Sequence, residues 1–338
     1  MIKKINNKKS ESELGIFHIS DLKIVKNIQS EQFYFELKKE YKEKLFGIAL
    51  LISKNIRTLA KQTNINYWNL WDCIRRTPIS LTNLKKLSNF LINNGFPEFN
   101  LEEIGKNTEY IKGGFTPEKM YDPKFPINFA TKSGMRFIAH LYHDGSIGKY
   151  NRQPYYINKS LKECRGFLED AKNIFGNFDR KIKKFEDGTY RVYLPTLIGD
   201  IMTSIGYTPG DKTRNNAKTF GFLCNIHDKA LISEFLAKAF NDDGFVAKRG
   251  IGLYQASLIK NNAKKPSNIL LLDKLFLEKL GLKVHGPNLR EVYQNMYGYC
   301  TGYIINVYSK KQLKIFNKHV KLIGYKRKKL ERFLNNGY

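Results

Sequence analysis

Two aspartate-glycine pairs close apolar stretches of similar pattern. The first ends "RFIAHLYHDG" (136–145) and the second ends "FLAKAFNDDG" (235–244). Asp144-Gly145 and Asp243-Gly244 stand roughly a hundred residues apart, a spacing that suits two copies of a small domain. Aspartate at a helix C-terminus is disfavoured by the helix dipole, so two in equivalent places require a compensating cation. Two carboxylates, phosphate oxygens and water form the oxygen-rich site that Mg²⁺ prefers, and such a site can support phosphodiester hydrolysis.

The same succession of elements is predicted after each pair. After the first come a strand near 150–158, a helix near 161–176, a hairpin over 180–195 and a helix near 196–207. After the second come strands or helices near 250–259, 267–282, 283–294, 298–309 and 310–325. Each half therefore reads helix-strand-strand-helix-strand-strand-helix. This pattern predicts an α+β fold with mostly antiparallel sheets.

The charge of the chain favours a polyanionic partner. Among 338 residues, Lys and Arg total 58 and Asp and Glu total 31, which gives a net charge of +27. Because lysine and arginine release counterions when they neutralise phosphates, nucleic acid is the first candidate. A biased residue composition, rich in Lys, Asn, Ile and Tyr, is the alternative source of this excess.

Other composition signals exclude several classes of protein. No stretch reaches the roughly 18 apolar residues that span a bilayer, and the N-terminus lacks the apolar region of a secretory signal. The four cysteines stand singly with no CxxC pair, which argues against a disulfide framework or a zinc knuckle. We therefore expect an intracellular protein with no membrane contact.

A second region with a nucleic-acid signature precedes the motifs. The stretch 56–92 predicts short helices over 58–63, 67–76 and 81–92, with a tight turn at 64–66. This resembles a helix-turn-helix, in which the second helix enters the major groove. Its candidate DNA-binding residues are Asn66, Tyr67, Asn69, Arg75 and Arg76. A three-helix bundle without a nucleic-acid role is the alternative.

These signals divide the chain into five segments. A charged lead-in, with one helix expected over 31–47, occupies residues 1–45. A small all-α, helix-turn-helix-like domain follows at 46–97. Residues 98–131, rich in glycine and proline, are expected to be a linker. The two repeats then occupy 132–230 and 231–338.

The paired motifs resemble the signature helices of the LAGLIDADG homing endonucleases of the double-motif, single-chain kind. The matching segments are 137–145 and 236–244, and the resemblance covers about two thirds of the chain. It implies two pseudo-symmetric αββαββα subdomains whose antiparallel strands form a DNA-binding saddle. It also implies a monomer that acts on double-stranded DNA and uses Mg²⁺.

The resemblance also assigns roles to residues. Asp144 and Asp243 would be the catalytic metal ligands, one for each DNA strand, with Gly145 and Gly244 beside them at the metal. The family places a basic residue near each acid, and Lys310 and Lys184 are the candidates. Lys184 is a substitute, because the first half has no lysine at the junction matching Lys310. A nickase or an inactive half is therefore an open alternative.

Two departures from the motif pattern affect the helix interface. His143 and Asp242 stand where a small residue usually precedes the acid, and Lys238 stands where glycine or alanine is frequent. Both departures predict looser packing of the two helices.

DNA contacts are expected from side chains around the first strands of each half. The candidates are Lys149, Asn151, Arg152, Gln153, Tyr155, Lys248, Arg249, Tyr254 and Gln255. The sequence thus predicts a site-specific, metal-dependent DNA endonuclease. The alternatives are a non-catalytic DNA-binding regulator and an RNA-splicing protein of the maturase type on the same fold.

Overall fold

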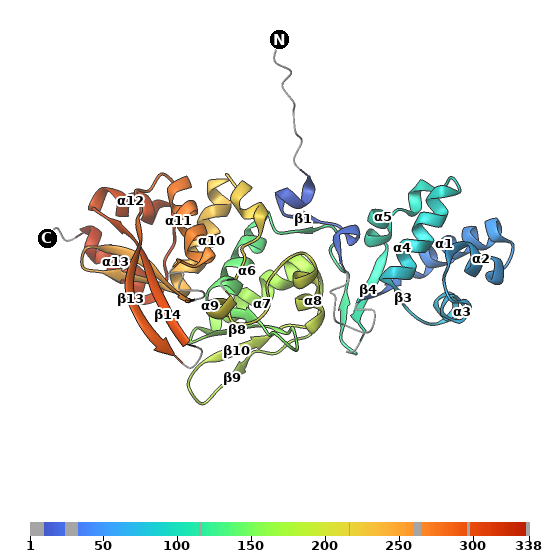
Figure 1. Ribbon diagram of the computed structural model, residues 1–338, viewed down its shortest axis with the longest axis horizontal. Coiled ribbons are helices and arrows are strands. Elements are labelled where there is room, and N and C mark those ends of the chain that lie inside the picture. Colours follow the sequence, from blue (N-terminus) through green and yellow to red (C-terminus); the bar gives the residue numbers. More distant parts are fainter. Residues whose placement is uncertain are drawn as a thin grey trace, which may run out of the picture.

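The computed structural model describes residues 10–23, 33–114, 117–215, 217–259, 265–295 and 298–335. Its domains lie in a row, with the N-terminal domain at one end and the second motif half at the other (Figure 1). The described residues form three four-stranded sheets and one two-stranded sheet, all antiparallel. The α+β class expected from the sequence is therefore observed.

The N-terminal domain combines helices with a sheet. Its sheet has the order β3-β2-β4-β5. In chain order its elements are β2 (Phe33–Leu37), α1 (Lys39–Ser53), α2 (Ile56–Thr63), α3 (Tyr67–Arg75), β3 (Ile79–Ser80), α4 (Leu81–Asn93), η3 (Pro97–Phe99), α5 (Leu101–Lys106), β4 (Thr108–Gly113) and β5 (Lys119–Tyr121). The expectation of a small all-α domain is therefore wrong.

The sheet was missed because its strands lie in segments interpreted otherwise. Phe33, Phe35 and Leu37 are buried in alternation, which is the period of a strand, so the expected helix over 31–47 is a strand followed by α1. Strands β4 and β5 fall within 98–131, the expected linker. Of the lead-in, residues 1–9 and 24–32 lie outside the described residues.

The helix-turn-helix elements agree closely with the predicted ranges. The Asn55 side chain accepts a hydrogen bond from Thr58 N (2.9 Å) at the start of α2, and Asn64 ends that helix with φ 51°. Asn66 then caps α3 by accepting from the backbone N–H groups of Trp68 and Asn69. Asparagine suits both positions, because it tolerates the left-handed conformation and accepts backbone hydrogen bonds at helix starts.

Short elements connect this domain to the repeats. They are η1 (Glu11–Leu14), β1 (Ile16–Phe17), η2 (Ile19–Asp21) and β6 (Ile127–Asn128). Strands β1 and β6 pair with each other, which fixes the start of the chain beside the entry to the first motif helix.

The two repeats have the same order of elements. The first contains α6 (Lys132–Tyr142), β7 (Gly145–Ile147), β8 (Pro154–Asn158), α7 (Leu161–Phe175), β9 (Lys183–Lys184), β10 (Tyr190–Tyr193), α8 (Thr196–Ser204) and α9 (Lys212–Asn215). After η4 (Gly221–Asn225), the second contains α10 (Lys229–Asp242), β11 (Gly244–Ala247), β12 (Gly250–Leu258), α11 (Asn268–Lys279), β13 (His285–Asn295), β14 (Gly298–Tyr308), α12 (Lys310–His319) and α13 (Gly324–Asn335). Their sheets run β7-β8-β10-β9 and β11-β12-β14-β13, so the strand order is identical.

Helices α6 and α10 pack side by side between the two sheets (Figure 1). Their buried faces include Phe137, Ile138, Phe235, Leu236 and Phe240. This burial explains the apolar pattern of both motifs. None of the helices in the described residues is long and apolar enough to cross a membrane.

The two glycines after the aspartates allow each strand to fold back tightly against its helix. A Cβ atom at Gly145 would lie 2.8 Å from the carbonyl oxygen of His140, and one at Gly244 would lie 2.6 Å from that of Phe240. Neither glycine has a positive φ. Their requirement is close approach to backbone atoms, which any side chain would prevent.

Candidate functional site

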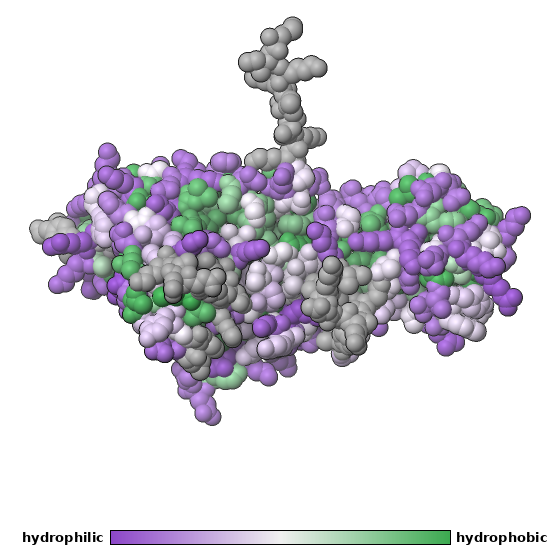
Figure 2. Space-filling view, in the orientation of Figure 1, coloured by the Kyte–Doolittle hydropathy of each residue, from purple (hydrophilic) through white to green (hydrophobic). Residues whose placement is uncertain are grey.

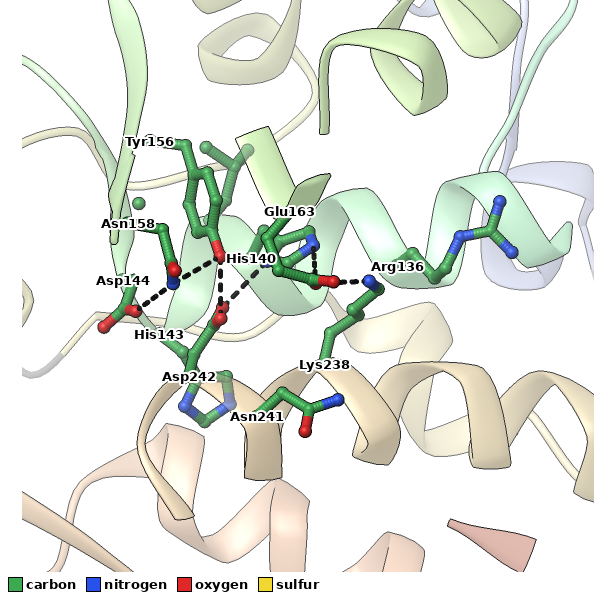
Figure 3. A network of polar contacts seen from close by, with 12 residues as sticks. Arg136, His140, His143, Asp144, Tyr156, Asn158, Glu163, Lys238, Asn241 and Asp242 are labelled. Carbon is green, nitrogen blue, oxygen red and sulfur yellow. Dashed lines mark hydrogen bonds and ion pairs between the residues drawn. The ribbon is translucent and has the colours of Figure 1, made fainter. Parts of the chain in front are cut away.

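The site lies where the C-terminal ends of α6 and α10 meet. His143 ends α6 and Asp242 ends α10, and each is followed by one of the predicted aspartates. Side chains of the two helix ends contact each other at this point: His140 contacts Asp242 (Figure 3), and His143 contacts Asp243. The negative charge of Asp243 contributes to the raised pKa of Asp144.

Two side chains contact the same carboxylate oxygen of Asp243. Its Oδ2 lies 2.8 Å from Nδ1 of His143 and accepts a hydrogen bond from Nε2 of Gln255 (2.5 Å) on β12. Burial opposes ionisation of Asp243, but the hydrogen bond and charge of His143, the charge of Lys212 and the hydrogen bond of Gln255 together outweigh it, so the pKa is lowered. Asp243 is therefore an ionised carboxylate with one oxygen that accepts no hydrogen bond from a described residue.

His143 is the positive partner in this half. Its side chain is fully buried, and its Nε2 lies 3.5 Å from Oδ1 of Asp273, a buried residue of α11. Burial disfavours the imidazolium, yet the two aspartates overcome it and raise the pKa of His143 to about 10. His143 is thus held as a cation between Asp243 and Asp273.

Asp144 is held by a longer chain of hydrogen bonds that ends on the opposite helix. Asn158 on β8 donates to Oδ2 of Asp144 (3.1 Å) and to the hydroxyl of Tyr156 (3.0 Å). That hydroxyl donates to Oδ1 of Asp242 (2.8 Å), whose Oδ2 lies 2.8 Å from Nδ1 of His140. Figure 3 shows this chain running from Asp144 through β8 to α10.

The charge environment of Asp144 is the opposite of that around Asp243. Burial raises its pKa, and repulsion from Asp242 and Asp243 raises it further, to about 7. No described basic side chain forms an ion pair with Asp144. A cation at this carboxylate would relieve the repulsion.

A lysine from another element caps the C-terminus of each motif helix. Lys212 donates from Nζ to the carbonyls of Tyr142 (2.9 Å), His143 and Gly145 (2.8 Å). Lys326 donates to the carbonyls of Asn241 (2.8 Å) and of its two neighbours in the last turn of α10. Burial lowers the pKa of Lys212 to about 8 and lowers that of Lys326 as well. These two ammonium groups satisfy the helix-terminal carbonyls and oppose the negative end of each helix dipole.

The departures from the motif pattern are accommodated by partners across the interface. Lys238 forms an ion pair with Glu163 of α7 (2.5 Å). Asp242 contacts His140 and Tyr156, and His143 contacts Asp243. The bulky residues at these positions are therefore paired, and the loose packing expected from them is not observed.

The two carboxylates could supply part of the coordination of a divalent cation, with the remaining ligands coming from a substrate. The described residues contain no cluster of three or more His, Cys, Asp or Glu side chains arranged for a metal ion. Asp144 and Asp243 each keep an oxygen that accepts no hydrogen bond from a described residue, and carboxylate oxygen suits Mg²⁺. The carbonyl oxygen of Gly145, which was expected at the metal, accepts a hydrogen bond from Lys212 (2.8 Å).

The two basic residues expected beside the acids, Lys184 and Lys310, are both exposed. Lys184 is exposed on β9, at the opposite edge of its sheet from β7, and three strand spacings of about 4.8 Å separate these edges. Lys310 is exposed at the first position of α12. Lys212 and Lys326 are the basic residues that the fold brings to the two helix ends.

The DNA-binding candidates of the first half fall mostly before the strand. Strand β8 begins at Pro154, so Lys149, Asn151, Arg152 and Gln153 occupy the preceding turn. Arg152 forms an ion pair with Asp200 (3.0 Å) and is largely buried. Gln153 donates to the carbonyl of Leu194, and Asn151 accepts from the backbone N–H of Gln153. Lys149 is exposed, and Tyr155 packs against Tyr193.

The candidates of the second half divide between a turn and a strand. Lys248 and Arg249 are exposed between β11 and β12. Tyr254 on β12 lies beneath the guanidinium of Arg290. Gln255, expected to contact DNA, instead contacts Asp243.

The candidates on the helix-turn-helix lie at or near an exposed face of α3. Asn69, Arg75 and Arg76 are exposed, whereas Asn66 serves as the cap of the helix. Tyr67 stacks on Trp71, and the guanidinium of Arg75 lies 3.6 Å from the centre of the Trp71 ring. Figure 2 shows hydrophilic side chains over much of the surface on this side, including the lower tip where Figure 1 places β9 and β10.

Several site residues were not found from the sequence. They are His140, Tyr156, Asn158, Glu163, Lys212, Asp273 and Lys326. A repeated tripeptide was the available signal for the two lysines: Ile-Gly-Tyr occurs at 205–207 and at 323–325, and a lysine follows each. The other residues lie on elements remote in sequence and carried no comparable signal.

Comparison with known proteins finds distant structural likeness only. No family model matches the chain, and no curated protein matches it. Solved structures of variants of the homing endonuclease I-DmoI align with 13% identity and a TM-score of 0.33, over 56% of this chain and 95% of theirs. A complex of I-DmoI with its target DNA in the presence of 2 mM Mn gives 14% and 0.34, over 56% and 93%. Full-length DUF199/WhiA from Thermatoga maritima gives 12% and 0.33, over 60% and 59%. Similarity at this level carries no argument about function.

Proposed function

We propose that this chain is a metal-dependent endonuclease of the homing type that cuts double-stranded DNA. The observation that carries the proposal is the meeting of two equivalent helix ends, each followed by an aspartate with one oxygen that accepts no hydrogen bond from the described part of the chain. Each aspartate also leads into a sheet of the same strand order. Two such half-sites suit the two strands of a duplex.

The residues of each half would have distinct roles. Asp144 and Asp243 would hold a divalent cation, which when bound supplies electrostatic stabilisation of a phosphate undergoing hydrolysis. Asn158 and Gln255 orient the two carboxylates by donating to one oxygen of each. Lys212 and Lys326 hold the helix ends in place by satisfying their carbonyls.

The charge distribution supports a polyanionic substrate. In the view of Figure 1, the β9–β10 hairpin, the long β13–β14 hairpin and α3 all extend toward the lower side of the molecule. The net charge of +27 favours association of this surface with DNA phosphates. The two sheets would form a pseudo-twofold saddle on the duplex, with α3 in an adjoining major groove.

One observation favours a second function, a DNA-binding protein without nuclease activity. Asp243 is already paired with the cationic His143, so the second half satisfies this carboxylate without a metal ion. An RNA-binding role of the maturase type would use the same charge, and no single contact favours it.

Cleavage of a plasmid library in the presence of Mg²⁺ tests the proposal. The wild-type chain is compared with the double variant Asp144→Asn/Asp243→Asn, which keeps the size of both side chains. We expect linear products from the wild type and none from the variant, while both retard duplex DNA in a binding assay. Tight binding by the wild type with no cleavage in Mg²⁺ or Mn²⁺ would favour the non-catalytic function.

A further inference from the structure

The sheet of the N-terminal domain has one covered face and one open face. Phe33, Phe35, Ile111 and Met120 point into the core. The alternate positions carry Tyr34, Glu36, Tyr110, Lys112, Lys119 and Tyr121, and the carboxylate of Glu36 is paired with Lys42 of α1 (2.7 Å). Because side chains alternate along a strand, these six share the opposite face. None of the predicted DNA-binding residues lies on it.

Two lysines stand directly opposite each other on this face. Lys112 of β4 pairs in register with Lys119 of β5. Like charges at such positions destabilise a sheet, and neither lysine forms an ion pair with a described acidic side chain. Their described neighbours are rings: the Lys119 ammonium lies 4.1 Å from the centre of Tyr110, and that of Lys112 lies 5.7 Å from the centre of Tyr34. The two lysines repel each other in the isolated fold, and a bound anion would relieve this repulsion.

The open face continues into a groove that reaches the predicted recognition helix. The groove has a volume of about 450 Å³. Its lining includes Lys112 and Tyr34 from the sheet, Asn69 and Asp72 from α3, and Asn83 from α4. Asp72 is the acidic side chain of this lining, and it lies on the α3 side. A duplex contacted by α3 would therefore bring its backbone past the sheet.

We propose that the open face of β2, β4 and β5 is a second DNA contact, which binds the phosphate backbone of the duplex next to α3. Lys112 and Lys119 neutralise phosphates, and the hydroxyls of Tyr110 and Tyr121 donate to phosphate oxygens. Side chains of these types make sequence-independent backbone contacts that fix the register of a recognition helix. This inference rests on the proposed DNA binding and not on nuclease activity.

Salt-dependent binding of the full chain tests this surface. The variant is Lys112→Gln/Lys119→Gln, and the probe is a 40-base-pair duplex of mixed sequence titrated in KCl from about 50 to 300 mM. Loss of two phosphate contacts should reduce the slope of log K against log salt by about 2, and should weaken binding about tenfold or more at 100 mM. A matched control, Lys314→Gln/Lys318→Gln, removes the same charge from exposed positions of α12 on the upper side of Figure 1.

Thermal melting accompanies the binding assay, and the Lys112/Lys119 variant should melt at or above the wild-type temperature because a like-charge pair is removed. Equal slopes for this variant and the α12 control would overturn the proposal. A loss of affinity confined to a single-stranded oligonucleotide of the same length would also overturn it, because the contact would then serve unpaired bases. If the wild type binds no duplex at any salt concentration, the proposed DNA binding fails instead.

Discussion

Asp243 sits between a cationic histidine and a glutamine, whereas Asp144 accepts from a single asparagine and faces two further carboxylates. The pKa is accordingly lowered at Asp243 and raised to about 7 at Asp144. Each aspartate nevertheless depends on the opposite helix: His143 of the first half contacts Asp243, and Asp242 of the second half ends the chain that holds Asp144. Repeats with the same strand order can thus build half-sites with different charge balances.

The largest expected effect is that a substitution in one half-site stops cleavage of one DNA strand and not of the other. Asp144→Asn and Asp243→Asn should each slow cleavage of one strand by about 1,000-fold or more, because several kcal/mol of cation-dependent stabilisation is lost. Each variant should convert a supercoiled target plasmid to nicked circles, and sequencing of the nick should locate it on opposite strands. A variant that still linearises the plasmid at the wild-type rate would contradict the assignment of one aspartate to one strand.

A smaller effect is expected from the side chains that orient the carboxylates. Tyr156→Phe removes the hydroxyl between Asn158 and Asp242. It should slow cleavage of the DNA strand assigned to Asp144 about 10- to 100-fold, which is the usual cost of losing an orienting partner. Gln255→Leu should slow the other strand. Strand-resolved rates on end-labelled duplexes measure both.

Tyr190→Phe is the control for these changes, because Tyr190 of β10 stands opposite Asn158 in the same sheet and is not a predicted site residue. It should leave the cleavage rates of both DNA strands unchanged. Equal slowing of the two strands by Tyr156→Phe would mean that the hydroxyl stabilises the interface as a whole.

The two helix caps should contribute to stability in both halves. Lys212→Met and Lys326→Met leave buried carbonyls without donors, so each should lower the free energy of unfolding by about 2–3 kcal/mol. Urea denaturation measures the loss, and Lys314→Met on the surface of α12 controls for the loss of charge. If either variant loses less unfolding free energy than the control does, the carbonyls must find other hydrogen-bond donors.

Divalent cations should stabilise the folded chain by relieving repulsion around Asp144. At about 30 times its dissociation constant, a cation that binds only the folded state adds about 2 kcal/mol. Thermal melting in Mg²⁺ and in EDTA should therefore differ for the wild type, and the difference should vanish in Asp144→Asn/Asp243→Asn. If the double variant retains the full shift, the cation binds elsewhere.

The smallest expected effect concerns the turns that precede β8 and β12, the second strand of each repeat. In the first half, burial raises the pKa of Asp200 to about 6, although Arg152 opposes the shift, while Arg249 in the second half is exposed. A raised carboxyl pKa contributes stability below the unfolded value near 4 that is lost as pH rises through 6. The free energy of unfolding of Asp200→Asn relative to wild type should therefore increase between pH 4 and 6. A constant difference, measured by urea denaturation at each pH, would contradict this.

The sequence predicted the two motif helices, most strands of the repeats and the helix-turn-helix, because local periodicity and caps such as Asn55 and Asn66 encode them. It misjudged the N-terminal domain, since β2 pairs with β4, which lies about 70 residues later, and pairing over that distance leaves little local signal. It did not find Lys212 and Lys326, the lysines that contact the ends of the two motif helices, because it had only the motif junctions as a guide.

The sequence by itself determined that Asp144 and Asp243 end two equivalent apolar helices, since residue type and period 3.6 suffice for that conclusion. Only the tertiary structure decided what surrounds them. His143, Asp242 and Lys238 appeared unsuited to a tight interface, and each proved to have a polar partner on another element. Contacts between side chains 75 to 102 positions apart depend on how helices pack, which no local pattern in the sequence specifies.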